Sequence, residues 1–149
     1  MSTVHVKTEI DAPIDRVWET VMDPDRFGEW VTIHRSIRHL SAKPLTEGAT
    51  MDQVMCIRGV TFRVHWTLVT VSAPHRAEWE GRGPAHSSAR ISYQLAGESE
   101  GPTAFEYTNE FTAPGGKLGN AASRMFVGAA SEREANKSLS RLKALLEQN

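Results

Sequence analysis

The feature that most constrains this chain is a series of short β-rich runs, each closed by a turn signal, that fills its middle. Between Val31 and Pro114 apolar residues recur with a period of two, the period of a strand that buries one face. The runs are separated by short segments such as Arg58-Gly59, which are typical of links between antiparallel neighbours. The pattern predicts an antiparallel meander of six strands, over residues 33–41, 50–57, 60–72, 75–80, 86–96 and 103–112.

A further strand and two short helices are predicted before the meander. Residues 4–10 alternate apolar and polar side chains, as a half-buried strand does. Asp11 is a candidate N-cap for the segment that follows, and Pro13 fits the first turn of a helix. Apolar residues then recur at helical spacing: Ile14, Val17, Trp18, Val21 and Met22. Asp23-Pro24 ends this helix, because a residue before proline is disfavoured in the α region, and a second helical turn is expected over 25–30.

The last part of the chain has helical spacing. The glycine-rich segment 114–119 breaks the strand pattern and is interpreted as a flexible turn. From about residue 121 to residue 148 the apolar positions lie mostly three or four residues apart: Met125, Ala129, Ala135, Leu139, Leu142 and Leu146. Neither Gly nor Pro occurs in the last 21 residues, so one long amphipathic helix is predicted.

This order of elements indicates one α+β domain over residues 1–149. One amphipathic helix cannot cover a flat sheet of seven strands. We therefore expect a curved seven-stranded antiparallel sheet around the long C-terminal helix, with the two short helices closing one end. The space left between sheet and helix is where a ligand pocket is expected.

Composition excludes several classes of function. Lys and Arg number 17 against 18 Asp and Glu, so no basic excess exists to bind a nucleic-acid backbone. No run of about 18 apolar residues is present, so we expect no transmembrane segment, and the N-terminus lacks the apolar core of a signal peptide. Cys56 is the single cysteine, which excludes an internal disulfide and favours a reduced, cytoplasmic setting. No metal site and no cofactor are predicted.

Two local segments resemble a known family. They are Ile10-Asp11-Ala12-Pro13-Ile14-Asp15-Arg16-Val17-Trp18 and Asp23-Pro24-Asp25-Arg26-Phe27-Gly28-Glu29-Trp30. With the closing helix, they resemble the helix-grip superfamily that includes the steroidogenic-acute-regulatory-related lipid-transfer domains, the birch-pollen allergen and bacterial polyketide cyclase/dehydrase-like proteins. The resemblance implies the helix-grip fold and an internal pocket. It supplies no catalytic motif, and such folds host transport, sensing and cyclisation alike.

Period two assigns the strand faces and so the candidate pocket wall. The ligand-binding candidates are Trp30, Gln53, Met55, Trp66, Trp79, Tyr93, Asn109, Phe111 and Phe126. Gln53 and Asn109 are amides on otherwise apolar faces, so each has a protein partner, a buried water or a ligand. For the tryptophans and tyrosines, core packing is the alternative to ligand contact. Most histidines fall on outer faces or strand ends, and His34 stands apart because it begins the strand after Trp30.

The leading hypothesis is a binding module for a small hydrophobic molecule that is lipid-, polyketide- or aromatic-like. The alternative is an enzyme of the polyketide cyclase or dehydratase type, in which Tyr93, Asn109 or Gln53 would orient a carbonyl. No catalytic base is identified, so the catalytic residues are unknown. A third hypothesis is an interaction protein that uses a sheet edge or a helix. A monomer or a weak homodimer is expected.

Overall fold

The computed structural model describes residues 2–112 and 129–148. Seven strands form one antiparallel sheet in the order β1-β7-β6-β5-β4-β3-β2. The strands are β1 (Ser2–Ile10), β2 (His34–Arg38), β3 (Thr50–Ile57), β4 (Val60–Ser72), β5 (Arg76–Arg82), β6 (Ser88–Gly97) and β7 (Thr103–Thr112). The helices are α1 (Ile14–Val21), α2 (Phe27–Trp30) and α4 (Ala129–Glu147), with short 3-10 helices η1 (Pro24–Arg26) and η2 (Pro84–His86).

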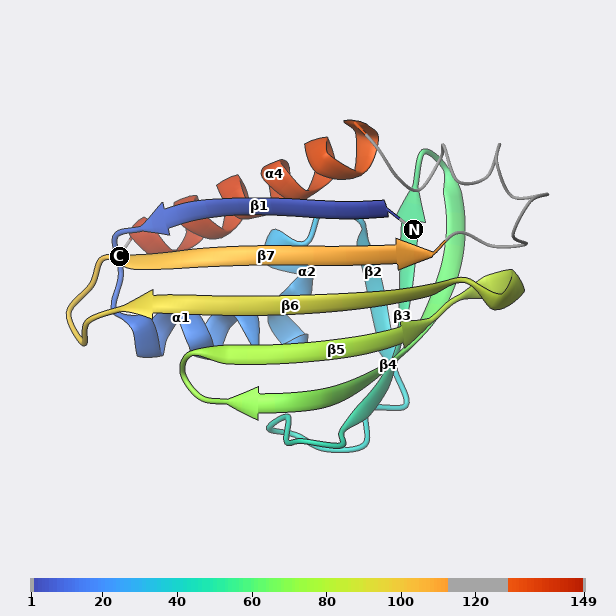
Figure 1. Cartoon of the computed structure of the whole chain (residues 1–149), viewed down its shortest axis with the longest axis horizontal. Coiled ribbons are helices and arrows are strands. Elements are labelled where there is room, and N and C mark those ends of the chain that lie inside the picture. The colour runs from blue at the N-terminus through green and yellow to red at the C-terminus, as the bar shows by residue number, and fades with distance from the viewer. Residues whose placement is uncertain (1, 113–128, 149) are drawn as a thin grey trace.

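The helices lie on the concave side of a strongly bent sheet (Figure 1). α4 runs alongside β1 at one edge, and α1 and α2 lie behind the middle strands. Strands β2 to β7 follow one another as the predicted meander, and β1 pairs with β7. The expected α+β helix-grip fold is therefore confirmed.

Two bulges accompany the curvature of the sheet. The pairing of β4 with β5 shifts register between Leu68 and Thr70, and the pairing of β2 with β3 shifts between His34 and Ser36. A bulge adds a residue to one strand, which bends and twists that strand locally. In β2, His34 pairs with Met55 and Ile37 pairs with Gln53, so both face the concave side although they are an odd number of positions apart in the sequence.

The apolar stripe of α4 packs on the inner face of the sheet as its spacing predicts. Leu139, Leu142 and Leu146 are all buried. The C-terminal end of α4 is tied to the end of β1, because Glu147 Oε2 accepts from the backbone N–H of Asp11 at 2.8 Å. None of the helices in the described part of the chain is long and apolar enough to cross a membrane.

Three local predictions are wrong. Asp11 does not cap α1, because the N-cap is Pro13 and the N–H of Asp11 is bound by α4 instead. β5 continues to Arg82 through Gly81, which we expected to begin a turn. His86 belongs to η2, so β6 begins at Ser88. The part of the predicted C-terminal helix that precedes Ala129 lies outside the described residues.

Candidate ligand-binding site

A cavity of about 150 Å³ lies between the concave face of the sheet, α2 and α4. The wall belongs to these elements because the inward positions of six neighbouring strands, β1 and β3 to β7, converge there. Its described residues are Val4, Phe27, Trp30, Val31, Thr32, Ile33, Met51, Gln53, Met55, Ile57, Phe62, Val64, Trp66, Trp79, Ala89, Ile91, Tyr93, Tyr107, Asn109, Phe111, Glu134, Ala135, Ser138 and Leu139. Most are aliphatic or aromatic, which is the typical lining of a small-molecule site.

Eight of the nine ligand-binding candidates line this cavity: Trp30, Gln53, Met55, Trp66, Trp79, Tyr93, Asn109 and Phe111. The ninth, Phe126, lies outside the described residues. Period two along the strands is thus enough to bring the strand candidates to one face. That these residues contact a ligand stays a prediction.

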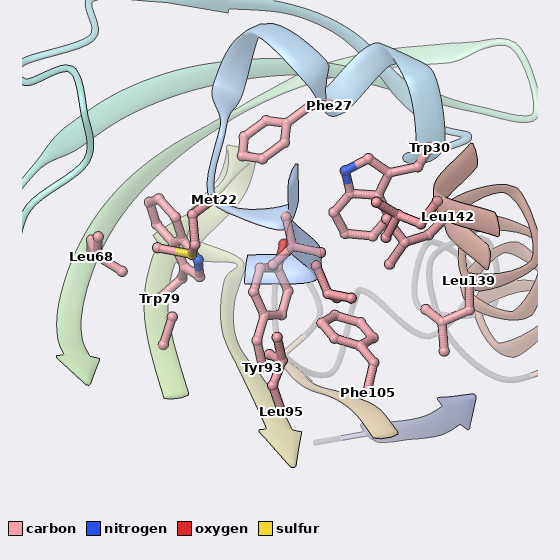
Figure 2. Packing of buried hydrophobic residues seen from close by; sticks show 14 of the residues in the cluster. Met22, Phe27, Trp30, Leu68, Trp79, Tyr93, Leu95, Phe105, Leu139 and Leu142 are labelled. Atoms are coloured by element: carbon pink, nitrogen blue, oxygen red, sulfur yellow. The ribbon is translucent and has the colours of Figure 1, made fainter. Parts of the chain in front are cut away.

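An aromatic cluster packs between α2 and the sheet, and two of its members, Trp30 and Tyr93, line the cavity (Figure 2). The side chain of Trp30 projects from α2 toward the sheet, and the side chains of Tyr93 and Phe105 project from the sheet toward it. The Trp30 ring lies 6.2 Å from Tyr93 and 6.3 Å from Phe105, centroid to centroid, both edge-on. Such contacts fix the indole plane. The packing therefore holds the two cavity-lining rings, Trp30 and Tyr93, in fixed positions.

Gln53 is held by two side chains. Trp66 Nε1 donates to Gln53 Oε1 at 2.9 Å, and Gln53 Nε2 lies 2.9 Å from His34 Nδ1. Of the alternatives open for Gln53, protein partners are therefore present. Burial, with a smaller effect of the Arg35 charge, lowers the pKa of His34. His34 is not among the described lining residues; it contacts the wall through its hydrogen bond with Gln53.

Three buried polar atoms on the wall have no hydrogen-bond partner among the described residues: Trp30 Nε1, Trp79 Nε1 and Asn109 Oδ1. Buried donors and acceptors are paired in the great majority of cases, because an unpaired one costs about 1–3 kcal/mol. Two N–H donors and one carbonyl acceptor without partners therefore belong to residues that line the same cavity. Asn109 thus differs from Gln53, whose oxygen and nitrogen both have protein partners.

The two tyrosines on the wall stay protonated over the physiological pH range. Burial raises the pKa of Tyr93 well above its ordinary value, and the neighbouring Tyr107 adds to the effect. Burial also raises the pKa of Tyr107 to about 12, against a smaller opposing effect of a hydrogen bond with Asn109. These hydroxyls can donate or accept hydrogen bonds, but they are not bases at neutral pH.

A polar contact joins α4 to the segment between α2 and β2. Thr32 Oγ1 donates to Glu134 Oε2 at 2.6 Å, and the N–H of Thr32 donates to Ser138 Oγ at 3.1 Å. All three residues line the cavity. The contact therefore closes the wall on the α4 side, and Glu134 is the one charged residue among the described lining residues.

Sequence reasoning missed Thr32, Glu134 and Ser138. The available signal was Ser138, which interrupts the apolar stripe of α4 one position before Leu139. Sequence reasoning also missed Gly81, which lies opposite Trp66 in the sheet. Within residues 2–112 and 129–148, no group of three or more His, Cys, Asp or Glu side chains could hold a metal ion.

Known proteins share this architecture. A family model described as polyketide cyclase / dehydrase and lipid transport matches residues 1–147. The Mycobacterium tuberculosis protein named Toxin Rv0910 is 24% identical over 101 residues, which cover 68% of this chain and 70% of that protein. The solved structure of a conserved protein from Geobacillus kaustophilus superposes with a TM-score of 0.73 at 16% identity, covering 98% of this chain and 95% of that one. DynU16, from the dynemicin biosynthetic locus, superposes with a TM-score of 0.67 at 23% identity; the match covers 99% of this chain and 48% of DynU16.

Proposed function

The chain belongs to the polyketide cyclase/dehydrase and lipid transport family, and we propose that it binds one small, neutral aromatic molecule in the cavity between sheet and α4. The size of the cavity supports a compact ligand. An engineered apolar cavity of about 150 Å³ takes up benzene, and the cavity here is about 150 Å³. A single ring of about the size of benzene therefore matches the cavity, whereas a long lipid or a multi-ring polyketide requires the wall to open.

The observation that carries the proposal is the set of unpaired polar atoms on an apolar wall. Trp30 Nε1 and Trp79 Nε1 would meet an oxygen acceptor, and Asn109 Oδ1 would meet a hydroxyl. A hydroxylated or carbonyl-bearing aromatic ring supplies both kinds of group. Binding it would satisfy atoms that the described part of the fold leaves unpaired, and it would bury the ring against aromatic side chains.

The charge of the wall favours a neutral ligand. Among the described lining residues the only charged one is Glu134, and its carboxylate accepts from Thr32. An anionic ligand would enter a low-dielectric space beside a carboxylate, which is unfavourable without a cation partner. We therefore expect neutral phenols and aryl ketones to bind better than benzoate or decanoate.

Calorimetric titration with phenol, toluene, acetophenone and decanoate tests this function. We expect saturable binding of the three neutral rings, with phenol tighter than toluene by a factor of about 2 to 10, as one hydrogen bond gives. In Asn109→Leu the advantage of phenol over toluene should disappear. If no neutral ring binds to the wild type, the proposed function is wrong.

A cyclase or dehydratase activity in the same cavity is the second candidate. The observation that favours it is Glu134, a carboxylate on the wall that could move a proton, together with tyrosines that stay protonated and can polarise a carbonyl. Conversion of an aromatic polyketide mimic by the wild type, lost in Glu134→Gln while toluene still binds, would establish it. Binding of the mimic without turnover would leave the carrier function alone.

A further inference from the structure

The chain of hydrogen bonds from Trp66 through Gln53 to His34 has only one possible direction. An indole nitrogen donates and never accepts, so Gln53 Oε1 must be the atom that faces Trp66. The other end of the amide, Nε2, then faces His34 Nδ1 and donates to it. His34 Nδ1 must therefore be unprotonated, and the imidazole is neutral with its proton on Nε2.

The surroundings of His34 favour that neutral form. Burial is the larger cause of its lowered pKa, and the adjacent Arg35 on β2 adds to it. From β3 the facing residues are Gln53 and Met55, neither of which carries charge.

The element packed on the other side of the imidazole also brings no charge to it. From α2, the Phe27 ring lies edge-on to His34 at 5.9 Å, and Gly28 lies close to Cδ2. The charged residue of α2, Glu29, is held by Arg26 at 2.8 Å. Among the described residues, Arg35 is thus the charged group that acts on His34, and no carboxylate opposes it.

Protonation of His34 is incompatible with the present orientation of Gln53. The proton would be added at Nδ1, where the Gln53 amino group already points its own hydrogen. The amide can accept from the imidazolium only by rotating, which turns its oxygen to His34 and its amino group to Trp66. The N–H of Trp66 then faces another donor, and both become free to meet a ligand.

We propose that the protonation state of His34 sets the hydrogen-bonding character of the cavity wall, by fixing or reversing the amide of Gln53. With neutral His34 the N–H of Trp66 donates to Gln53, so it cannot donate to a ligand. With protonated His34 the wall gains N–H donors. Gln53 is the specificity-determining residue and His34 the positioning residue. This inference rests on the proposed binding function, since the reorientation of Gln53 alters selectivity only if a molecule binds in the cavity.

The reorientation is tested first without any ligand. The indole N–H resonance of Trp66, assigned by its loss in Trp66→Phe, is followed by ¹H–¹⁵N NMR from about pH 8 to about pH 4 alongside the His34 imidazole. We expect the Trp66 resonance to move with the same midpoint as His34. In His34→Asn, where the amide oxygen replaces Nδ1 as an acceptor that cannot titrate, the resonance should stay still. In His5→Gln, an exposed histidine of β1, it should move as in the wild type.

The effect on selectivity is tested with acetophenone and its apolar analogue ethylbenzene. When His34 becomes protonated, we expect the affinity for acetophenone relative to that for ethylbenzene to rise by a factor of about 2 to 10, the effect of one added hydrogen bond. In Gln53→Met the N–H of Trp66 is free at every pH, so the gain should be present at neutral pH and constant. In His34→Asn it should be absent throughout.

The outcomes separate the two claims. If both probes bind but their affinity ratio and the Trp66 resonance ignore the titration of His34, the proposed control by His34 is wrong and the binding function stands. If neither probe binds at any pH, the binding function is wrong, and the NMR titration alone decides whether His34 turns the amide. A Trp66 resonance that moves in His34→Asn as in the wild type also overturns the role of His34.

Discussion

Replacing Gly81 by alanine should displace the Trp66 side chain, which lines the cavity. Gly81 pairs with Trp66 across β4 and β5, and the indole lies over it. A Cβ atom at position 81 would stand 2.5 Å from Trp66 Cζ3 and 2.8 Å from Val64 Cγ1. Ordinary carbon contacts are about 3.5–4.0 Å, so the indole must move by about 1 Å. This close approach explains why glycine, which weakens a strand, occupies the position.

The cost of that movement can be estimated from its two parts. Overpacking a tight site costs about 1–3 kcal/mol. Trp66 Nε1 is 2.9 Å from Gln53 Oε1, and a shift of about 1 Å takes the pair beyond hydrogen-bonding distance. The stranded indole N–H adds about 1–3 kcal/mol. Alanine recovers about 0.5–1 kcal/mol of backbone entropy, so Gly81→Ala should lower the free energy of unfolding by about 1–5 kcal/mol.

Urea denaturation, followed by circular dichroism, measures this change. Gly28→Ala is the matched control, because its Cβ would meet only His34 Cδ2, at an ordinary 3.6 Å. The control should be as stable as the wild type or more stable by up to about 1 kcal/mol, since alanine favours a helix. In the Trp66→Phe background, Gly81→Ala should cost less, because the smaller ring relieves the contact with the indole and no hydrogen bond to Gln53 remains to be lost, although the contact with Val64 stays. A midpoint for Gly81→Ala equal to that of Gly28→Ala would refute the proposed contact.

Three further predictions concern stability. Leu142→Ala should lower the free energy of unfolding by about 2–5 kcal/mol, because the side chain is fully buried between α4 and the sheet; a urea midpoint that barely moves would contradict the helix face. Asn109→Leu should change stability little, because the buried oxygen that it removes has no partner in the described residues, which offsets the loss of the hydrogen bond with Tyr107; a large fall in melting temperature would mean that the Asn109 oxygen also bonds a neighbour in the core. Because the pKa of His34 is lowered in the folded state, the unfolded chain takes up the proton more readily. Stability should therefore fall as the pH drops below about 6.5, and the fall should be smaller in His34→Asn across a series of denaturation curves.

Much of the fold could be predicted because the strands follow a strict period of two. The bounds of β3, β4 and β7 agree with those predicted, and the inward positions of Trp66, Tyr93 and Asn109 follow from alternation alone. A helical stripe likewise fixed the buried face of α4. These features are local patterns, which a sequence displays directly.

The missed features depend on contacts between distant segments. Strict alternation along β2 would separate His34 from Ile37, but the bulge between His34 and Ser36 brings both to the concave side. Gly81 was expected to begin a turn because its tertiary reason, the indole of Trp66 on the next strand, is invisible in the local sequence. The partners of Gln53 and the unpaired oxygen of Asn109 likewise depend on the assembled sheet.

The central claim, that the cavity between sheet and α4 binds a small neutral aromatic molecule, is tested most directly by locating such a molecule on the protein. Intermolecular nuclear Overhauser effects would be measured between acetophenone and the isotope-labelled chain. We predict effects from the probe protons to Trp30, Trp79, Tyr93 and Asn109, residues that share the cavity wall. Effects confined to exposed outer-face residues such as Arg63 or Arg90, or no effects at a concentration that saturates the calorimetric signal, would contradict it.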